Sequence, residues 1–488
     1  MVLLRIAYLL LLFVIYNCFF ILGLLNSKCL FLFNIQYNKN SQKQAQRFTQ
    51  FLVSAGPVFI KLAQVISTRV DLFSETYITE LKKLRDSVNP IAKKHIVKII
   101  ERDFNQNIAD IFLELSDVPL ASASIAQVHK AKLLDGKDVI VKVIKPKTSK
   151  LFRQDIALLK LIFTILQTFS KRGKISKPLK IVTHLEEVMK LELDLRFECA
   201  SMDELRDNFV NDKVLYIPKI YWNYVSQNVL VEEFIDGVSL NNVSELKNRN
   251  LNLNKITEDL TKIFFLQILR DGYFHADMHA GNIFVNKSGQ VAFVDFGIMG
   301  RLSLPLRKYL FDLFLAFVNK DYKKASEIHF QAGWISNKYN VDDFALACRS
   351  IMAKLLDKPQ KDIKIGELLQ QLFIISGNFE MEIQEDLLLL QKNLMYLENL
   401  GRVLSPNENM WLLSKKIISE NIDKKTVFKD TLKNKYKVFF NEAIQIKNNF
   451  LNYNKIIKEN NDITLNNSKL IRILVFFVFF ILVLLILR

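Results

Sequence analysis

The feature that most constrains this chain is a short stretch, 275–297, in which polar residues recur between apolar runs. It begins His-Ala-Asp-Met-His-Ala-Gly-Asn and ends Asp-Phe-Gly, so that Asp277 precedes Asn282 by five positions and Asp295 follows the run Val-Ala-Phe-Val. Amide and carboxylate oxygens suit Mg²⁺, which prefers hard ligands and keeps some of its water. A separate Asp can orient an attacking hydroxyl or water. A loop–strand–loop unit would bring these three side chains together.

A second polar residue interrupts an apolar strand upstream. Lys142 stands within Val-Ile-Val-Lys-Val-Ile, residues 139–144, after the hairpin signal Asp135-Gly136. One interpretation is an edge-strand lysine whose ammonium reaches solvent; the other is the strand lysine that holds nucleotide phosphates. Strand 229–233 then ends in Phe-Ile-Asp-Gly, which is typical of a hinge between two lobes.

These parts stand in the order of a protein-kinase active site. The sequence therefore predicts an α+β, protein-kinase-like two-lobe fold that uses ATP and Mg²⁺. In this interpretation Lys142 binds the α/β-phosphates, Asn282 and Asp295 hold the metal, and Asp277 orients the attacking oxygen as the catalytic residue.

The two histidines of the stretch leave an alternative open. His275 and His279 flank Asp277 with the spacing of an HxDxH metal cluster. The commoner role for His275 is a buried structural support, and His279 could position the loop.

Glycine-rich phosphate loops are missing. No GxGxxG or GxxxxGK occurs, which excludes a P-loop, a dinucleotide fingerprint and the usual glycine-rich kinase loop. An alanine-rich segment stands in that place before Lys142, and alanine has a narrower backbone range than glycine. We predict nucleotide contacts along this segment, at Ala121, Ser122, Ala123, Ser124, Ile125, Ala126, Gln127 and Val128.

Four motifs together resemble those of the UbiB (aarF/ABC1-kinase-like) atypical kinases. They are the alanine-rich loop, Lys61-Leu62-Ala63-Gln64 for KxGQ, Glu192-Leu193-Asp194 for ExD, and residues 275–282 for HADPHPGN. Glu198 stands in the place of the helix glutamate that pairs with the strand lysine. The chain departs from the pattern at Ala63, which replaces a glycine, and at Met278 and Ala280, which replace prolines.

The resemblance implies a helical N-terminal extension that lies over the ATP site. Lys61 and Gln64 would reach in and meet Glu192 and Asp194 as gating residues. Such a cover would obstruct a protein substrate, which favours ATP hydrolysis or a small or lipid-like acceptor. The family supports biosynthesis of ubiquinone, a polyprenyl quinone, and is linked to its ring-hydroxylation stage. Membrane lipid, polyprenyl quinone precursors and a quinone biosynthetic enzyme complex are therefore the expected partners.

Two other classes stay open. One is a nucleotide-binding scaffold of the biosynthetic complex, although such a scaffold need not keep Asp277, Asn282 and Asp295 together. The other is the polyprenylphenol hydroxylase itself. A flavin enzyme would need a dinucleotide fingerprint, and a di-iron enzyme would need Glu-x-x-His pairs, which none of the six histidines completes.

Apolar segments stand at both ends of the chain. Residues 473–487 carry no charge, and 470–488 approaches the roughly 20 residues that cross a bilayer, which predicts a C-terminal transmembrane helix. Residues 6–25 favour a signal anchor or a helix lying on the membrane over a cleaved signal peptide. Lysines and arginines flank both segments, which predicts a bacterial inner-membrane protein whose body faces the cytoplasm.

The formal charge of +17 could indicate nucleic acid or anionic lipid. Because no short Lys/Arg block with interleaved aromatics occurs, no nucleic-acid partner is expected. We expect six regions: an apolar segment 1–40, a helical KxGQ-type extension 41–110, an N-lobe with a helical insertion 111–235, a C-lobe 236–415, a Lys/Asn-rich linker 416–469 and the anchor 470–488.

Overall fold

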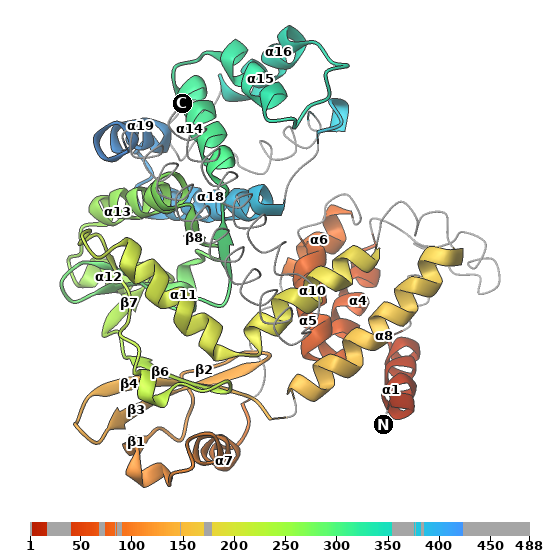
Figure 1. Cartoon of the computed structure of the whole chain (residues 1–488), viewed down its shortest axis with the longest axis vertical. Helices are drawn as coiled ribbons and strands as arrows, with labels where there is room; N and C mark the ends of the chain where they lie inside the picture. Colours follow the sequence, from red (N-terminus) through yellow and green to blue (C-terminus); the bar gives the residue numbers. More distant parts are fainter. Residues whose placement is uncertain are drawn as a thin grey trace, which may run out of the picture. The chain divides into compact units, whose positions relative to one another are not determined.

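The computed structural model describes residues 2–16, 41–67, 74–82, 84, 90–146, 148–169, 178–353, 375, 377–381 and 385–422. These residues form helices and three β-sheets, as an α+β fold requires (Figure 1).

The N-lobe is built on a five-stranded antiparallel sheet. Its order is β1 (Phe112–Leu115), β3 (Ala126–Leu133), β4 (Asp138–Ile144) and β6 (Val229–Glu233), with β2 (Ala121–Ser122) also paired to β3. Because side chains alternate along a strand, Val139, Val141 and Val143 are buried on one face and Lys142 lies on the other. β4 is paired on both sides, so the interpretation of Lys142 as an edge-strand residue is wrong.

Helix α7 (Lys93–Phe104) completes this lobe. Its residues Ile96, Ile99 and Ile100 recur at helical spacing and pack into the core formed by β1, β3, β4 and β6. Helix α7 therefore shares the core of the N-lobe sheet, although it precedes residue 111 in the chain.

A second group of elements lies after the hinge, except for β5, which precedes it in the chain. One sheet has the order β5 (Leu215–Tyr216), β10 (Val291–Phe293), β9 (Ile283–Asn286) and β7 (Gly237–Ser239). A small sheet pairs β8 (Tyr273–His275) with β11 (Met299–Arg301). The helices here are α12 (Val243–Asn248), α13 (Leu253–Phe265) with its continuation η3 (Leu266–Asp271), α14 (Leu304–Val318), α15 (Tyr322–Gln331), α16 (Val341–Met352), α18 (Glu385–Leu404) and α19 (Met410–Asn421).

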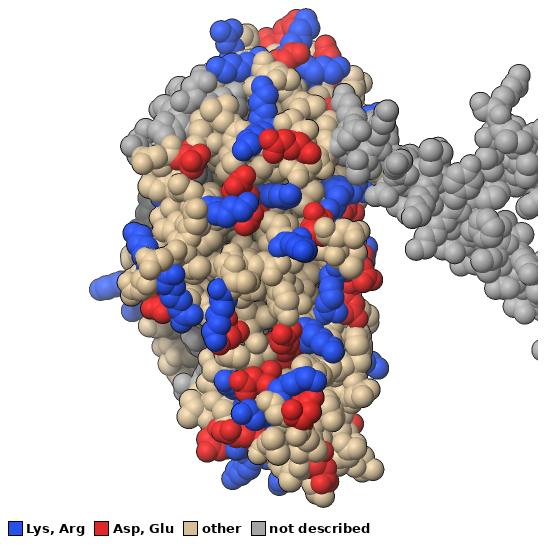
Figure 2. Space-filling model, turned by 90° about the vertical axis from the view of Figure 1, so that its left-hand side faces the viewer, with Lys and Arg blue, Asp and Glu red and all other residues tan. Residues whose placement is uncertain are grey.

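Charges of both signs share the surface. On the face drawn in Figure 2, Lys and Arg side chains are interspersed with Asp and Glu side chains. Such mixing is typical of a solvated surface.

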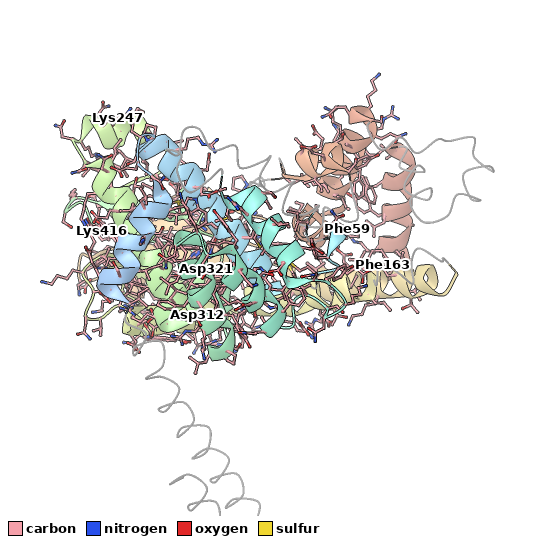
Figure 3. The ribbon with its side chains drawn as sticks, turned by 90° about the horizontal axis from the view of Figure 1, so that it is seen from above. Phe59, Phe163, Lys247, Asp312, Asp321 and Lys416 are labelled. Carbon is pink, nitrogen blue, oxygen red and sulfur yellow. The ribbon has the colours of Figure 1, made fainter. Side chains whose placement is uncertain are left out.

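The N-terminal helices pack on the insertion helices. α4 (Gln42–Ala55), α5 (Pro57–Ser67) and α6 (Glu75–Lys82) contact one another, and α5 also contacts α8 (Thr148–Phe169) and α10 (Pro178–Glu192). Figure 3 shows Phe59 of α5 and Phe163 of α8 in this group. Gly56, with φ of 107°, ends α4 in a conformation that favours glycine, and Pro57 begins α5. Ala63 lies inside α5 and is fully buried, so alanine suits the helical backbone there.

Arg5 and Tyr8 attach the first helix, α1 (Val2–Ile15), to this group, and Tyr8 donates its hydroxyl to the Ser54 carbonyl at 3.0 Å. The Arg5 guanidinium donates to both carboxylate oxygens of Asp155 on α8, each at 2.7 Å, and to the backbone carbonyl of Ala55. The Asp155 side chain is only 1% exposed, so Arg5 neutralises a buried charge.

The membrane predictions fall largely outside the described residues. The C-terminal transmembrane helix at 470–488 and all of the linker beyond residue 422 lie there, as does the apolar N-terminal sequence after residue 16. Among the helices that the structure does describe, none combines the length and the apolar character needed to cross a bilayer.

Candidate active site

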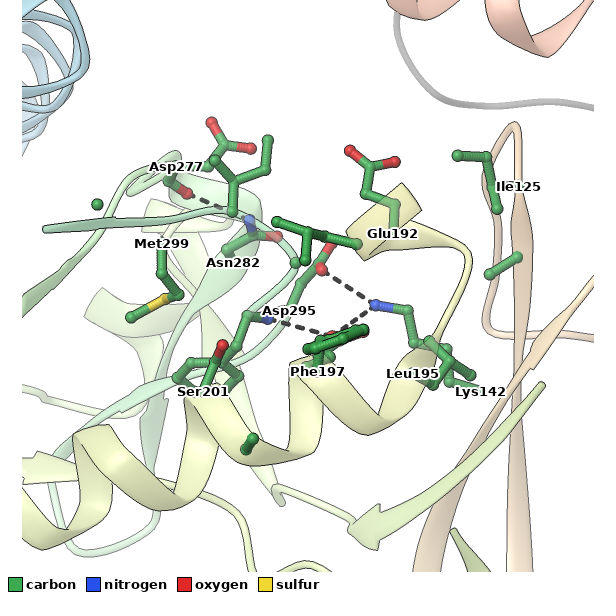
Figure 4. Close-up of a pocket in the computed structure, with 18 of the residues that line it drawn as sticks. Ile125, Lys142, Glu192, Leu195, Phe197, Ser201, Asp277, Asn282, Asp295 and Met299 are labelled. Atoms are coloured by element: carbon green, nitrogen blue, oxygen red, sulfur yellow. Dashed lines mark hydrogen bonds and ion pairs between the residues drawn. The ribbon is translucent and has the colours of Figure 1, made fainter. Parts of the chain in front are cut away.

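Three charged side chains from distant parts of the chain meet at Lys142. Its Nζ donates to Glu198 Oε1 at 2.7 Å and to Asp295 Oδ1 at 3.0 Å (Figure 4). Glu198 comes from the first turns of α11 (Leu195–Asn208), and Asp295 from the loop after β10. The strand lysine, the helix glutamate and the Asp-Phe-Gly aspartate are thus brought together.

Burial and charge perturb each member of this cluster. Burial opposes the charge of Lys142, but Asp295 and Glu198 outweigh it and raise the pKa of the ammonium. Lys142 in turn holds the pKa of Asp295 well below its usual range. Burial raises the pKa of Glu198, whose Oε1 also accepts the Phe296 N–H at 3.1 Å. The lysine therefore stays charged and Asp295 stays ionised.

Glu232 is a fourth member that the sequence reasoning missed. It lies buried on β6, and burial together with the charge of Glu198 raises its pKa to about 8. The available signal was a glutamate in the apolar run Val-Leu-Val-Glu-Glu, comparable with the lysine in β4.

His275 supports this site by bonding the backbone of Asp295 and Asp277. Its Nε2 lies 2.8 Å from the carbonyl oxygen of Asp295, which can only accept, so Nε2 carries the proton and Nδ1 accepts the Asp277 N–H at 3.1 Å. Burial lowers the pKa of His275, and its ring packs edge-on against Phe293 and Phe296. With both nitrogens engaged, His275 cannot bind a metal, and the HxDxH alternative is wrong. In the described part of the chain, no group of three or more His, Cys, Asp or Glu side chains is placed to hold a metal.

The loop between β8 and β9 presents the two remaining polar groups. Asn282 ends the short turn η4 (Ala280–Asn282), and its Nδ2 donates to the Asp277 carbonyl at 3.2 Å. His279 accepts the Gly281 N–H at Nδ1, at 3.0 Å, and its Nε2 lies 3.8 Å from Asp277 Oδ2. His279 therefore holds the shape of the loop.

Asn282 and Asp295 are suitable Mg²⁺ ligands. Both line one cavity of about 810 Å³, together with Asp277 and Lys142. The bond from the Asn282 amide nitrogen fixes which atom of that side chain is the oxygen. Asp295 adopts a left-handed φ of 62° that aspartate tolerates, and its side chain is 54% exposed. An amide oxygen and an ionised carboxylate on one cavity wall match the donor set that Mg²⁺ prefers.

The alanine-rich segment contributes only its turn to this cavity. Ala123, Ser124, Ile125 and Ala126 line it, whereas Ala121, Ser122, Gln127 and Val128 lie in the paired strands β2 and β3 beside the turn. Nucleotide contact at these last four positions stays a prediction. Gln127 is fully buried and bonds the backbone of Ile91 and the ring of His129. Lys145, which the sequence reasoning missed, donates to the Ala123 carbonyl at 2.7 Å and holds the turn.

The N-terminal extension reaches the cavity with an ion pair. Lys61 Nζ of α5 lies 3.0 Å from Glu192 Oε1 at the end of α10, and both residues line the cavity with side chains only 13% and 12% exposed. Asp194 caps α11 and pairs with Arg196 at 2.6 Å, which lowers the pKa of Asp194. Its expected contact with the KxGQ residues stays a prediction. Gln64 lies on α5, and its side chain is outside the described part.

Helix α18 also touches the site, which no sequence motif indicated. Lys392 Nζ donates to Asp277 Oδ1 at 2.7 Å, and Asn393 bonds the backbone of the same loop. Asp386 of α18 lines the cavity.

Comparison with known proteins identifies the family. The ABC1 atypical kinase-like domain matches residues 83–329, and the UbiB helical domain matches residues 348–409. "Probable protein kinase UbiB" of Marinobacter nauticus is 39% identical over 75% of this chain and 68% of its own length. The protein of the same name from Pasteurella multocida is 38% identical over 76% of this chain and 73% of its own.

A solved structure shares the fold. "The complex structure of Rv3197-erythromycin from Mycobacterium tuberculosis" superposes with a TM-score of 0.54 at 21% identity and covers 73% of this chain and 90% of that one. The kinase-like α+β fold predicted from the sequence is confirmed by these matches. The chain therefore belongs to the UbiB family of atypical kinase-like proteins.

Proposed function

We propose that this protein is a Mg²⁺-ATP-dependent atypical kinase or ATPase. The observation that carries the proposal is the cluster of Lys142, Glu198 and Asp295 in one cavity with Asp277 and Asn282. The names of the relatives, which describe a probable protein kinase, agree with a phosphotransferase class.

Each side chain has a defined part in this reaction. The Lys142 ammonium, fixed by Glu198, neutralises charge on the α/β-phosphates. Asn282 and Asp295 would hold Mg²⁺, which when bound offsets the charge that develops on the transferred phosphoryl group. Asp277 orients the attacking oxygen and accepts its proton, and a hydroxyl or water oxygen forms the new bond to phosphorus as the bond to ADP breaks.

The acceptor is small or lipid-like, or is water. The Lys61–Glu192 ion pair places α5 over one side of the cavity, where a protein acceptor would have to approach. The described cavity of about 810 Å³ is in the range of small-molecule sites.

The biological setting that we propose is polyprenyl quinone biosynthesis at its ring-hydroxylation stage, which rests on family membership. The protein would act at the inner membrane of a bacterium with its body in the cytoplasm, next to quinone precursors and the enzymes that modify them. On the face drawn in Figure 2, basic and acidic side chains alternate, and this face offers no extended basic patch for nucleic acid. A di-iron hydroxylase gains no support either, since the described residues hold no suitable ligand cluster.

Mg²⁺-dependent ATP hydrolysis by the full chain tests the enzymatic proposal. Asp295→Asn should lower turnover by about 10²-fold or more, because a charged Mg²⁺ ligand becomes neutral. Asp342→Asn is the matched control, since Asp342 lies on α16 in an exposed pair with Lys323. Equal turnover of the wild type and Asp295→Asn would refute the metal role.

Quinone profiling tests the setting. Cells that lack the protein should accumulate an early prenylphenol, and the wild-type copy, but not Asp277→Asn, should restore the quinone. Normal quinone levels without the protein would refute the pathway while leaving the ATP site intact.

A further inference from the structure

Helix α18 contacts the loop that carries Asp277. This helix lies outside the matched kinase-like region and inside the matched UbiB helical domain. Its residues nevertheless contact the loop at three points, through Lys392, Asn393 and Tyr396. Nothing in the kinase-like motifs assigns a role to these side chains.

The first contact fixes the Asp277 carboxylate. Lys392 Nζ donates to Oδ1 at 2.7 Å, and the other oxygen, Oδ2, faces His279 Nε2 at 3.8 Å. The Lys392 and Asp277 side chains are 33% and 25% exposed, so the pair is partly shielded from solvent. A carboxylate held at one oxygen by an ammonium has a restricted orientation.

The second contact fixes the backbone on either side of Asp277. Asn393 is fully buried; its Oδ1 accepts the Met278 N–H at 3.1 Å, and its Nδ2 donates to the His275 carbonyl. A proline at position 278, as in the family pattern, has no N–H and could not make the first of these bonds. The methionine is thus compatible with a loop that the neighbouring helix holds in place. The ring of Tyr396, edge-on to His279 with centroids 6.4 Å apart, completes the contact.

We propose that Lys392 is a positioning residue for phosphoryl transfer, through which the helical domain sets the orientation of the Asp277 carboxylate. The proposal rests on the function proposed above. Lys392 acts through Asp277 and not on the nucleotide, because Lys392 does not line the cavity whereas Asp277 does. A misplacement of about 1 Å at a reacting group can cost about 10²-fold in rate, so loss of this contact should affect kcat.

Steady-state ATP turnover of Lys392→Met in the full chain is the first test. We expect kcat to fall by about 10- to 100-fold while the KM for ATP changes less than about threefold, because the Lys142 cluster is untouched. Lys392→Arg should recover a large part of the lost kcat, since a guanidinium can still donate to the carboxylate. Lys338→Met is the matched control, because it removes the lysine of an exposed lysine–carboxylate pair with Glu380. A normal kcat in Lys392→Met would overturn the proposal.

A double-mutant cycle separates positioning from general damage. If Lys392 acts through Asp277, Lys392→Met should change the residual kcat of Asp277→Asn less than about threefold. A full additional loss in that background would overturn the proposal.

The same cycle in urea unfolding does not depend on turnover. The midpoint shift of the double variant should fall short of the sum of the single shifts, because each single variant removes the same ion pair. Additive shifts would overturn the proposal even if the wild type hydrolyses no ATP, a result that would by itself refute only the proposed function.

Discussion

Replacing Lys142 with methionine should destabilise the protein in a pH-dependent way. The change keeps most of the apolar stem and removes the ammonium that lies 2.7 Å from the Glu198 carboxylate. The Glu198 side chain is 8% exposed and loses its cationic partner, whereas Asp295 is half exposed and can be solvated. The effect on stability therefore arises chiefly at Glu198.

The magnitude follows from this burial. Removing one partner of a buried pair costs about 3–5 kcal/mol of unfolding free energy. The Phe296 N–H still donates to Glu198 at 3.1 Å in the variant, which places the expected loss near the lower end, about 3 kcal/mol at about pH 8.

The sign of the pH dependence is set by the raised pKa of Glu198. Burial already raises this pKa with Lys142 present, and removal of the ammonium raises it further. The folded state of the variant then binds a proton that the unfolded state, with a pKa of about 4.3, has released. The destabilisation is absent below the unfolded pKa and grows as the pH rises towards the folded pKa. The pKa of Glu232, about 8 in the wild type, should also rise in the variant, because the charge of Lys142 lowers it.

Urea unfolding of the full chain at about pH 5.5 and about pH 8 measures this effect. The midpoint of Lys142→Met should lie well below that of the wild type at the higher pH and much closer to it at the lower. The double variant Lys142→Met/Glu198→Gln should recover most of the stability, since no unpaired carboxylate remains at position 198. Equal shifts at both pH values, or no recovery in the double variant, would show that Lys142 does not balance a buried charge.

Three further predictions concern the parts that surround the cavity. Arg5→Met strands the buried Asp155 and should lower the unfolding free energy by about 3 kcal/mol, with recovery in Arg5→Met/Asp155→Leu in the same urea assay. Gly300→Ala would place a methyl carbon 2.1 Å from the buried ring of Phe274, so the thermal midpoint should fall by an amount that corresponds to at least about 1–3 kcal/mol of overpacking. Lys61→Ala breaks the Lys61–Glu192 pair at the cover and should allow phosphate transfer to a generic protein such as casein, measured with radiolabelled ATP; no gain in transfer would contradict the covering role of α5.

Local sequence patterns were sufficient to predict strand β4 of the N-lobe sheet and the position of Lys142 on it. The alternation in Val-Ile-Val-Lys-Val-Ile predicts a strand, and β4 spans Asp138–Ile144 with Lys142 opposite its valines. The Asp-Gly turn signal likewise lies between β3 and β4. The hydrophobic periodicity of a segment indicates which of its faces is buried. The predictions of the strand and of the position of Lys142 required only this information.

Contacts between distant segments were not predictable in this way. Lys392 meets Asp277 across 115 positions, and a lysine on an amphipathic helix carries no signal of such a partner. Asp194 shows why a motif alone does not fix a contact: an aspartate that precedes a helix is also a good cap, and Asp194 caps α11 with Arg196 within its reach. Its expected contact with the N-terminal extension stays a prediction, because the Gln64 side chain lies outside the described residues.

Three lysines, each from a different part of the chain, hold the carboxylates around the cavity. Lys142 belongs to the N-lobe sheet, Lys61 to the N-terminal helices and Lys392 to the helical domain. The kinase-like region at 83–329 supplies Lys142 and the carboxylates of Glu192, Glu198, Asp277 and Asp295, but it contains neither Lys61 nor Lys392. Without those two lysines, Glu192 and Asp277 would lose the ion pairs that orient them. The geometry of the candidate site is therefore a property of the N-terminal helices, the kinase-like lobes and the helical domain packed together, and the kinase-like region alone does not determine it.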